Sequence, residues 1–174
     1  MRRRRTQNGS AILEFALAGI VFIFVWIGIV QLAIGMWQYH TLQHAVKAAG
    51  AYVSLHGADC SIAPNSCAIQ VKDAAQVVRN LAFGINPTIV NMTFTILAAD
   101  HTTEISHVSC RLDNCLSTGT TTWPPAGNNS PGQDFTIKAD FLFQSALSMV
   151  APGSGSSQFG SVHLAGYTHQ LILF

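Results

Sequence analysis

Residues 15–37 decide the fold of this chain, and they read FALAGIVFIFVWIGIVQLAIGMW. Gln31 is the only clearly polar side chain in this stretch. An α-helix needs about 20 apolar residues to cross the hydrocarbon core of a bilayer. Such a helix is apolar on all sides, as contact with lipid requires, whereas the core helix of a soluble protein has a one-sided apolar stripe. The stretch therefore predicts one transmembrane helix, which we place at residues 10–39.

The composition of the chain is typical of a membrane-anchored protein. Of its 174 residues, 49% are apolar and only 10% are charged, against roughly 25% charged residues in an ordinary globular protein. This composition excludes disorder as the main state, because disordered chains have few apolar residues and many charges. The length is sufficient for one domain with a sizeable core.

The basic residues are concentrated at one end. Residues 2–5 are four of the nine basic residues, and the other five are outnumbered by eight acidic residues. Because positive charge stays on the cytoplasmic side of a membrane helix, we expect a cytoplasmic N-terminus and an exported, mildly acidic remainder. A cleavable secretory signal peptide is the alternative, but its apolar region is typically about 7–15 residues long. No good small-x-small cleavage site follows the apolar stretch, because bulky or polar residues come directly after residue 37.

Glu14 lies directly before the apolar stretch, which is unusual for a carboxylate. Burying a charged side chain at the centre of a membrane costs about 2.5–3.5 kcal/mol on insertion scales. In one interpretation Glu14 lies in the first helical turns near the lipid headgroups, where the helix dipole favours an acid. The other interpretation depends on the residues around it.

A short basic leader, Gly9, four small or apolar residues, then Glu14 and Phe15 resemble the prepilin peptidase site of type IV pilins. The resemblance implies cleavage after Gly9, so that residues 1–9 are a leader and Ser10 becomes the new N-terminus. It also implies that Glu14 and Phe15 serve assembly, with the glutamate neutralising the N-terminal amine among packed helices. A carboxylate in apolar surroundings does need a cationic partner.

The resemblance continues beyond the processing motif. The segment GSAILEFAL, the apolar run and then QYHTLQHAVKAA are similar to the TadE-like pseudopilins of the tight-adherence (Flp-type) pilus machinery. That family's pattern ends near A-A-R, whereas residues 48–50 here are Ala-Ala-Gly. The N-terminal 55 residues carry nearly all of the resemblance.

This resemblance implies a minor pilin or pseudopilin that helps to initiate, prime or cap an adhesive pilus. The implied partners are the bacterial inner membrane, a prepilin peptidase, sister pseudopilins and the membrane assembly platform, with residues 40–174 forming a periplasmic head. Incorporation into the filament and retention in the platform both stay open. The alternative function is an uncleaved single-span membrane protein whose periplasmic head binds a ligand or partner.

The pattern outside the membrane predicts an α+β fold. Apolar residues recur with helical spacing up to residue 53, and no helix breaker occurs before Gly57, so we expect one helix over residues 10–55. At 1.5 Å per residue its length would be roughly 69 Å. A second amphipathic helix is expected at residues 68–83, ending before Gly84. The predicted helical face consists of Leu42, Ala45, Val46, Ala49 and Val53.

Beyond Pro87 the apolar period changes to two, which indicates half-buried strands. Loops rich in Ser, Thr, Gly, Asn and Pro are expected at residues 117–134 and 152–157. We therefore predict a small antiparallel sheet packed on the amphipathic half of the long helix. The predicted strands are residues 91–96, 104–112, 135–143 and 161–174.

Four cysteines lie in the exported part, where disulfides persist. Their spacing does not match a zinc or redox CxxC motif. We expect two local disulfides, Cys60–Cys67 and Cys110–Cys115, although crossed pairing is not excluded by the sequence. The second would close a hairpin turn at residues 111–114.

No pattern points to an enzyme. His40 and His44 are one helical turn apart, but they lack the glutamate of an H-E-x-x-H metal site. The segment at residues 153–157, GSGSS, is not a nucleophile elbow, which needs G-x-S-x-G between a strand and a helix. No basic stripe for nucleic acid is present. We expect no catalysis, no cofactor, no metal and no nucleic-acid partner.

Overall fold

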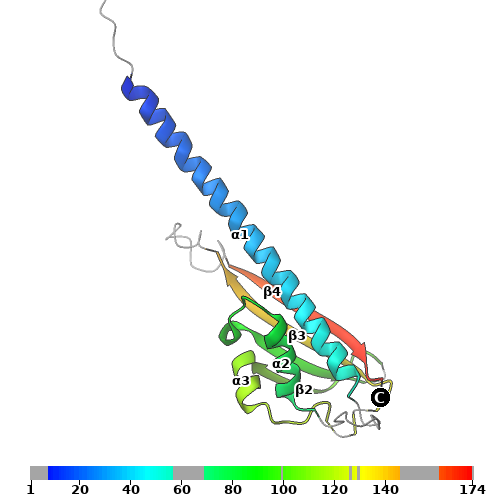
Figure 1. The fold of residues 1–174 in the computed structure, drawn as a ribbon. Coiled ribbons are helices and arrows are strands. Elements are labelled where there is room, and N and C mark those ends of the chain that lie inside the picture. The colour runs from blue at the N-terminus through cyan, green and yellow to red at the C-terminus, as the bar shows by residue number, and fades with distance from the viewer. Residues whose placement is uncertain are drawn as a thin grey trace, which may run out of the picture.

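The computed structural model describes residues 8–56, 69–98, 100–125, 127–128, 130–145 and 161–173. A long helix carries, on its C-terminal half, a head of shorter helices and a four-stranded antiparallel sheet (Figure 1). This architecture confirms the predicted α+β fold. In chain order the elements are α1 (Asn8–Ser54), α2 (Val71–Leu81), the 3-10 turn η1 (Pro87–Ile89), β1 (Asn91–Leu97), β2 (Glu104–Arg111), α3 (Leu112–Thr118), β3 (Asp134–Gln144) and β4 (Ser161–Leu171).

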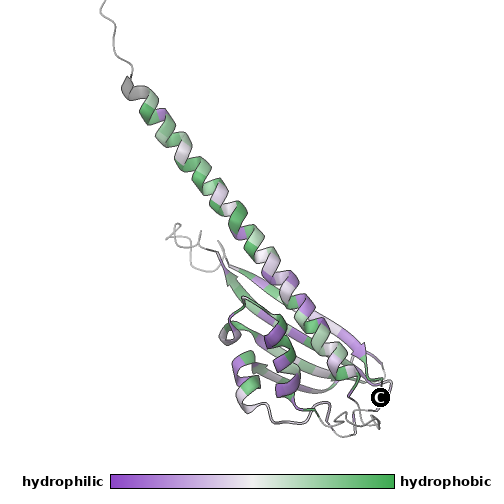
Figure 2. Ribbon diagram, in the orientation of Figure 1, coloured by the Kyte–Doolittle hydropathy of each residue, from purple (hydrophilic) through white to green (hydrophobic). Residues whose placement is uncertain are grey.

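The helix α1 runs without a break through 47 residues, which corresponds to about 70 Å. It confirms the single long helix expected from the sequence. The N-terminal part projects from the head and is mostly apolar, whereas polar residues become frequent where α1 meets the head (Figure 2). The predicted apolar face is buried, with 0% exposure at Leu42, Ala45, Val46, Ala49 and Val53.

The sheet has the strand order β2-β1-β3-β4, and every neighbouring pair is antiparallel. Phe94 of β1 lies opposite Ile137 of β3 and Val108 of β2. One continuous cluster of buried residues joins this face of the sheet to α1 and α2. The apolar faces predicted for the first and third strands are buried, but Thr95 and Thr136 of the opposite face are buried as well, so the expected alternation is confirmed only in part.

The helix α1 crosses β4 at two glycines. A Cβ atom added to Gly166 would lie 3.1 Å from Val46 Cγ2 and 3.3 Å from the carbonyl oxygen of Leu42. A Cβ atom added to Gly50 would lie 2.7 Å from Thr168 Cγ2. The helix and the strand therefore approach more closely than larger residues at these positions would permit.

The side chain of Gln43 covers the outer edge of β4. Its amide nitrogen donates to the carbonyl oxygen of Ala165 at 3.2 Å, and its amide oxygen accepts from the backbone N–H of Tyr167 at 3.4 Å. An unpaired strand edge is a template for pairing with another chain. Gln43 occupies part of this edge with one side chain, as a neighbouring strand would.

The segment expected as a surface loop at residues 117–134 contributes a core residue. Trp123 is 1% exposed, and its ring lies edge-on against Phe94 and Phe135 at centroid distances of 5.2 and 5.5 Å. The backbone N–H of Trp123 donates to the carbonyl oxygen of Ile69 at 3.0 Å. Because the segment is mostly polar, its composition did not predict that Trp123 packs in the core.

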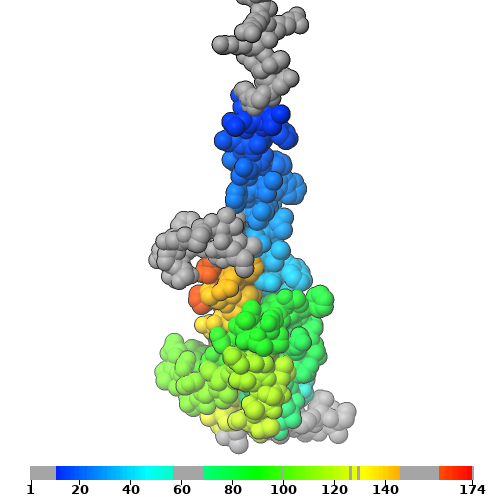
Figure 3. Space-filling model, turned by 90° about the vertical axis from the view of Figure 1, so that its left-hand side faces the viewer, coloured from blue at the N-terminus to red at the C-terminus, as the bar shows by residue number. Residues whose placement is uncertain are grey.

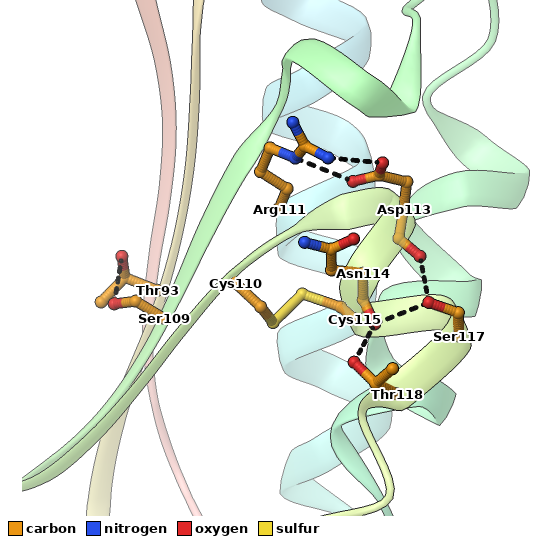
Figure 4. Close-up of a disulfide and its surroundings, with 9 residues drawn as sticks. All are labelled: Thr93, Ser109, Cys110, Arg111, Asp113, Asn114, Cys115, Ser117 and Thr118. Carbon is orange, nitrogen blue, oxygen red and sulfur yellow. Dashed lines mark hydrogen bonds and ion pairs between the residues drawn. A yellow bond between two sulfur atoms is a disulfide. The ribbon is translucent and has the colours of Figure 1, made fainter.

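The predicted disulfide Cys110–Cys115 is present, with a Cα–Cα distance of 5.6 Å (Figure 4). It joins the end of β2 to α3. The prediction of a hairpin turn at residues 111–114 is wrong, because the chain enters a helix there. The other expected pair, Cys60 and Cys67, lies outside the described residues.

The burial of two side chains explains why a helix, and not a hairpin turn, follows Cys110. Leu112 and Cys115 are three residues apart, and both are buried, with 1% and 0% exposure. A spacing of three places both side chains on one face of a helix. Asp113 in the first turn of α3 accepts from the guanidinium of Arg111 at 3.1 Å (Figure 4). A hairpin would instead send adjacent side chains to opposite faces.

Candidate functional site

The residues predicted for processing and assembly lie together at the start of α1. Because the helix begins at Asn8, its first turns contain Gly9, Ser10, Glu14 and Phe15. Ser10 and Glu14 are four residues apart, which is about 6 Å along the axis on the same helical face. The side chains of Glu14 and Phe15 are exposed.

The part of α1 that follows this segment has the surface of a membrane helix. No Asp, Glu, Lys or Arg lies between Glu14 and Lys47. The most apolar window has a mean hydropathy of 2.6, and none of it is buried. Among the described residues, α1 is the one helix long and apolar enough to cross a membrane. This finding supports membrane anchoring through the N-terminal helix.

Trp37 of α1 contacts the head just beyond α2. A Cβ atom at Gly84 would lie 2.5 Å from Trp37 Cη2, so the indole ring lies against the backbone just beyond α2. Gly84 has a φ of +80°, the left-handed conformation that glycine adopts readily after a helix. The second helix ends earlier than expected, at Leu81 with Ala82 as its C-cap, so Gly84 does not end the helix but lies in the turn that follows it. Its missing side chain makes room there for Trp37.

The ends of β3 and β4 approach α1 slightly nearer its N-terminus. A Cβ atom at Gly35 would lie 3.5 Å from Cε1 of Phe143, which is ordinary van der Waals contact. Figure 3 shows these strand ends, in orange and red-orange, beside the part of α1 that leaves the head. The head and the apolar helix therefore overlap along the helix axis.

A polar cluster lies elsewhere in the head, and the sequence did not reveal it. Asp134, at the start of β3, is 4% exposed and pairs with Nδ1 of His101 and, at 3.4 Å, with Nε2 of His169. Burial alone would raise the pKa of Asp134, but the hydrogen bond and charge of His101, followed by those of His169, outweigh burial and lower it.

The loop between β1 and β2 presents His101 to this cluster. His101 has a φ of 59°, and Asp100 accepts from the backbone N–H groups of Thr102 and Thr103 at 3.0 and 2.9 Å. Hydrogen bonds from the side chain and backbone of Thr103, then from Thr102, hold the pKa of Asp100 below its usual range. The sequence alone does not bring His101 and His169 together with Asp134, since these contacts depend on loop conformation and strand register.

The described residues contain no group of three or more His, Cys, Asp or Glu side chains arranged to hold a metal ion. His40 and His44, which have the spacing of a metal pair, are both exposed on α1. The ring of His40 lies edge-on to Tyr39 at a centroid distance of 5.5 Å.

The fold and the N-terminal segment define a class of protein: one candidate membrane helix that continues without a break into an α+β head. A model of the TadE-like protein family matches residues 9–50. The predicted TadE-like resemblance is thus confirmed over this segment, and with the apolar helix it fits a membrane protein associated with the Tad pilus. No curated protein and no solved structure matches the chain.

Proposed function

We propose that this protein is a pseudopilin or minor pilin that acts in the assembly of a tight-adherence pilus, and that it is not an enzyme. Its N-terminus lies in the cytoplasm, α1 crosses the bacterial inner membrane, and the head is periplasmic. The observation that carries the proposal is the coincidence of the TadE-like match at residues 9–50 with α1. The matched segment contains the processing motif, the apolar span and most of the face that packs on the head.

In this proposal a prepilin peptidase cuts between Gly9 and Ser10, in the first turns of α1. The first four N–H groups of a helix have no partner within the helix. Glycine inside a helix costs about 1 kcal/mol relative to alanine. Both effects favour opening of this end, which would present an extended backbone to the peptidase.

Glu14 then has a role that depends on cleavage. The new amine of Ser10 and the carboxylate of Glu14 form the polar pair among helices packed side by side in lipid. A carboxylate surrounded by apolar groups needs such a partner. Sister pseudopilins and the assembly platform supply the neighbouring helices.

The intact mass of the chain expressed with a prepilin peptidase tests the processing step. The mature chain is expected to begin at Ser10, and Gly9→Leu is expected to abolish cleavage. Gly19→Leu is the matched control, because no atom lies within 4 Å of a Cβ at Gly19. A wild-type chain that keeps its leader would favour an uncleaved membrane protein with a ligand-binding head.

A second arm tests assembly. Glu14→Ala and Glu14→Gln are expected to be inserted and processed normally, yet to form no pili, since neither neutralises the amine of Ser10. Pilus formation is counted by electron microscopy. Normal piliation in both variants would show that Glu14 has no role in assembly.

A further inference from the structure

An apolar pocket lies between α1 and the ends of β3 and β4. Its volume is about 370 Å³, which is within the range of roughly 300–1,000 Å³ for small-molecule sites. Both walls are almost entirely apolar. The residues that matter here are Gly28, Leu32 and Gly35 on α1, and Phe143, Val162 and Leu164 on the strands.

The position of the pocket along α1 relates it to the membrane. Counted from Ile12, a span of 20 residues ends at Gln31 and covers about 30 Å, the thickness of the hydrocarbon core. Gln31 itself lines the pocket. If the span is residues 15–37, the hydrocarbon core extends further toward the head. With either position of the span, the pocket lies at, or within, the membrane leaflet on the head's side.

The surroundings of the pocket are also apolar and exposed. Val162 is 55% exposed and Leu142 is 38% exposed at the ends of β4 and β3. Phe83 is 77% exposed beside Gly84, which lies against Trp37 at a nearby level of α1. Apolar side chains gathered around one end of a head indicate contact with another apolar phase.

We propose that this pocket holds an acyl chain of a phospholipid from the leaflet on the head's side, so that the ends of β3 and β4 rest in the membrane surface. The pocket continues the lipid-facing surface of α1, and its walls offer an acyl chain contact on two sides. An acyl chain in the pocket also keeps water away from its apolar walls. The inference rests on the membrane anchoring in the proposed function, but not on processing or pilus assembly.

Two glycines on α1 provide a matched pair for testing occupancy. Neither Gly19 nor Gly28 has an atom within 4 Å of an added Cβ, so a side chain fits at both positions. Only Gly28 lines the pocket. Gly28→Leu therefore places a side chain where the acyl chain would lie, whereas Gly19→Leu changes the same helix outside the pocket.

The full chain is reconstituted in phosphatidylethanolamine–phosphatidylglycerol vesicles with a photocrosslinking benzoyl-phenylalanine at one position at a time. Val162 reports on the pocket, and Tyr167, 52% exposed on the other face of β4, is the control of similar exposure. Phe22, 65% exposed on α1, reports on membrane insertion. The readout is the mass increase of one covalently attached phospholipid.

Lipid adducts are expected at positions 22 and 162 but not at position 167. Gly28→Leu is expected to remove the adduct at position 162, and Gly19→Leu to leave it. Adducts at position 22 without any at position 162, or crosslinks from position 162 to a second copy of the chain, would overturn the pocket proposal alone. Absence of adducts at position 22 as well would overturn the membrane anchoring together with it.

Discussion

Asp134 shows how one residue can tie distant parts of the head together. It pairs with His101 from the loop between β1 and β2 and with His169 from β4. Side chains of both histidines are partly exposed, at 64% and 43%, whereas that of Asp134 is 4% exposed. The carboxylate is therefore the desolvated member of the cluster, and its two partners offset the cost of burying its charge.

The lowered pKa of Asp134 predicts a pH-dependent contribution to stability. This contribution is present above the pKa of an unfolded aspartate, about 3.9, and is lost as pH falls through the lower pKa of the folded state. Asp134→Asn is expected to reduce the free energy of unfolding near pH 6 by about 1–2 kcal/mol, because solvent screens both histidines. Near pH 3 the difference from wild type should shrink.

Thermal unfolding of the full chain in detergent micelles at both pH values measures this effect. Asp140→Asn is the control, because Asp140 is more exposed and its nearest cation, the Lys138 ammonium, lies 3.6 Å away on the sheet surface. A difference between wild type and Asp134→Asn that stays constant from pH 6 to pH 3 would contradict the linkage.

At the scale of elements, the close crossing of α1 over β4 limits the size of the side chain that position 166 can carry. Gly166→Ala is expected to destabilise the head by about 1–3 kcal/mol, the usual cost of overpacking. Its Cβ would approach Val46 Cγ2 and the backbone oxygen of Leu42, and the backbone of a helix cannot easily move away. Thermal unfolding followed by near-ultraviolet circular dichroism measures the change.

Gly19→Ala is the control for this crossing, because it adds the same methyl group to α1 in open space. The control is expected to leave the unfolding of the head unchanged. Equal melting temperatures for wild type and Gly166→Ala would mean that α1 and β4 can separate without cost, and that the close approach does not constrain the head.

The elements were predictable wherever one chain segment carried its own signal. The apolar helical face from Leu42 to Val53 and the apolar strand face around Phe94 follow from periodicity alone. The side chains of both faces are buried in the structure. The motif from Gly9 to Phe15 is contiguous, so its residues could be recognised together. Their place at the start of α1 follows directly from the long helix.

Contacts between distant segments could not be predicted in this way. Gln43 reaches β4 only because α1 packs against that strand. The pairing of Asp134 with His169 depends on how β3 and β4 align. The pocket beside Gly28 has walls from α1 and from strands more than a hundred residues later. Neither composition nor spacing carries such information.

At the scale of the whole molecule, α1 serves as both membrane anchor and core element. Its apolar half projects from the head, and its second half supplies a fully buried face to the core. The basic residues 2–5 set the orientation of α1 in the membrane. Since the helix is continuous, this orientation also determines the side of the membrane on which the head folds. The Cys110–Cys115 disulfide then reports that side, because disulfides persist outside the reducing cytoplasm.

Replacing the arginines at positions 2–5 with serine is therefore expected to leave a fraction of heads in the cytoplasm with reduced cysteines. A Cys60→Ser/Cys67→Ser background restricts the readout to Cys110 and Cys115. Denatured, unreduced protein is treated with a polyethylene glycol maleimide, which labels free thiols and slows migration on a gel. The parent protein should stay unlabelled, as should a Lys72→Ser/Arg79→Ser control in α2, whose charges lie too far from the span to orient it. Labelling of the parent protein would place the head on the reducing side and would contradict the proposed orientation.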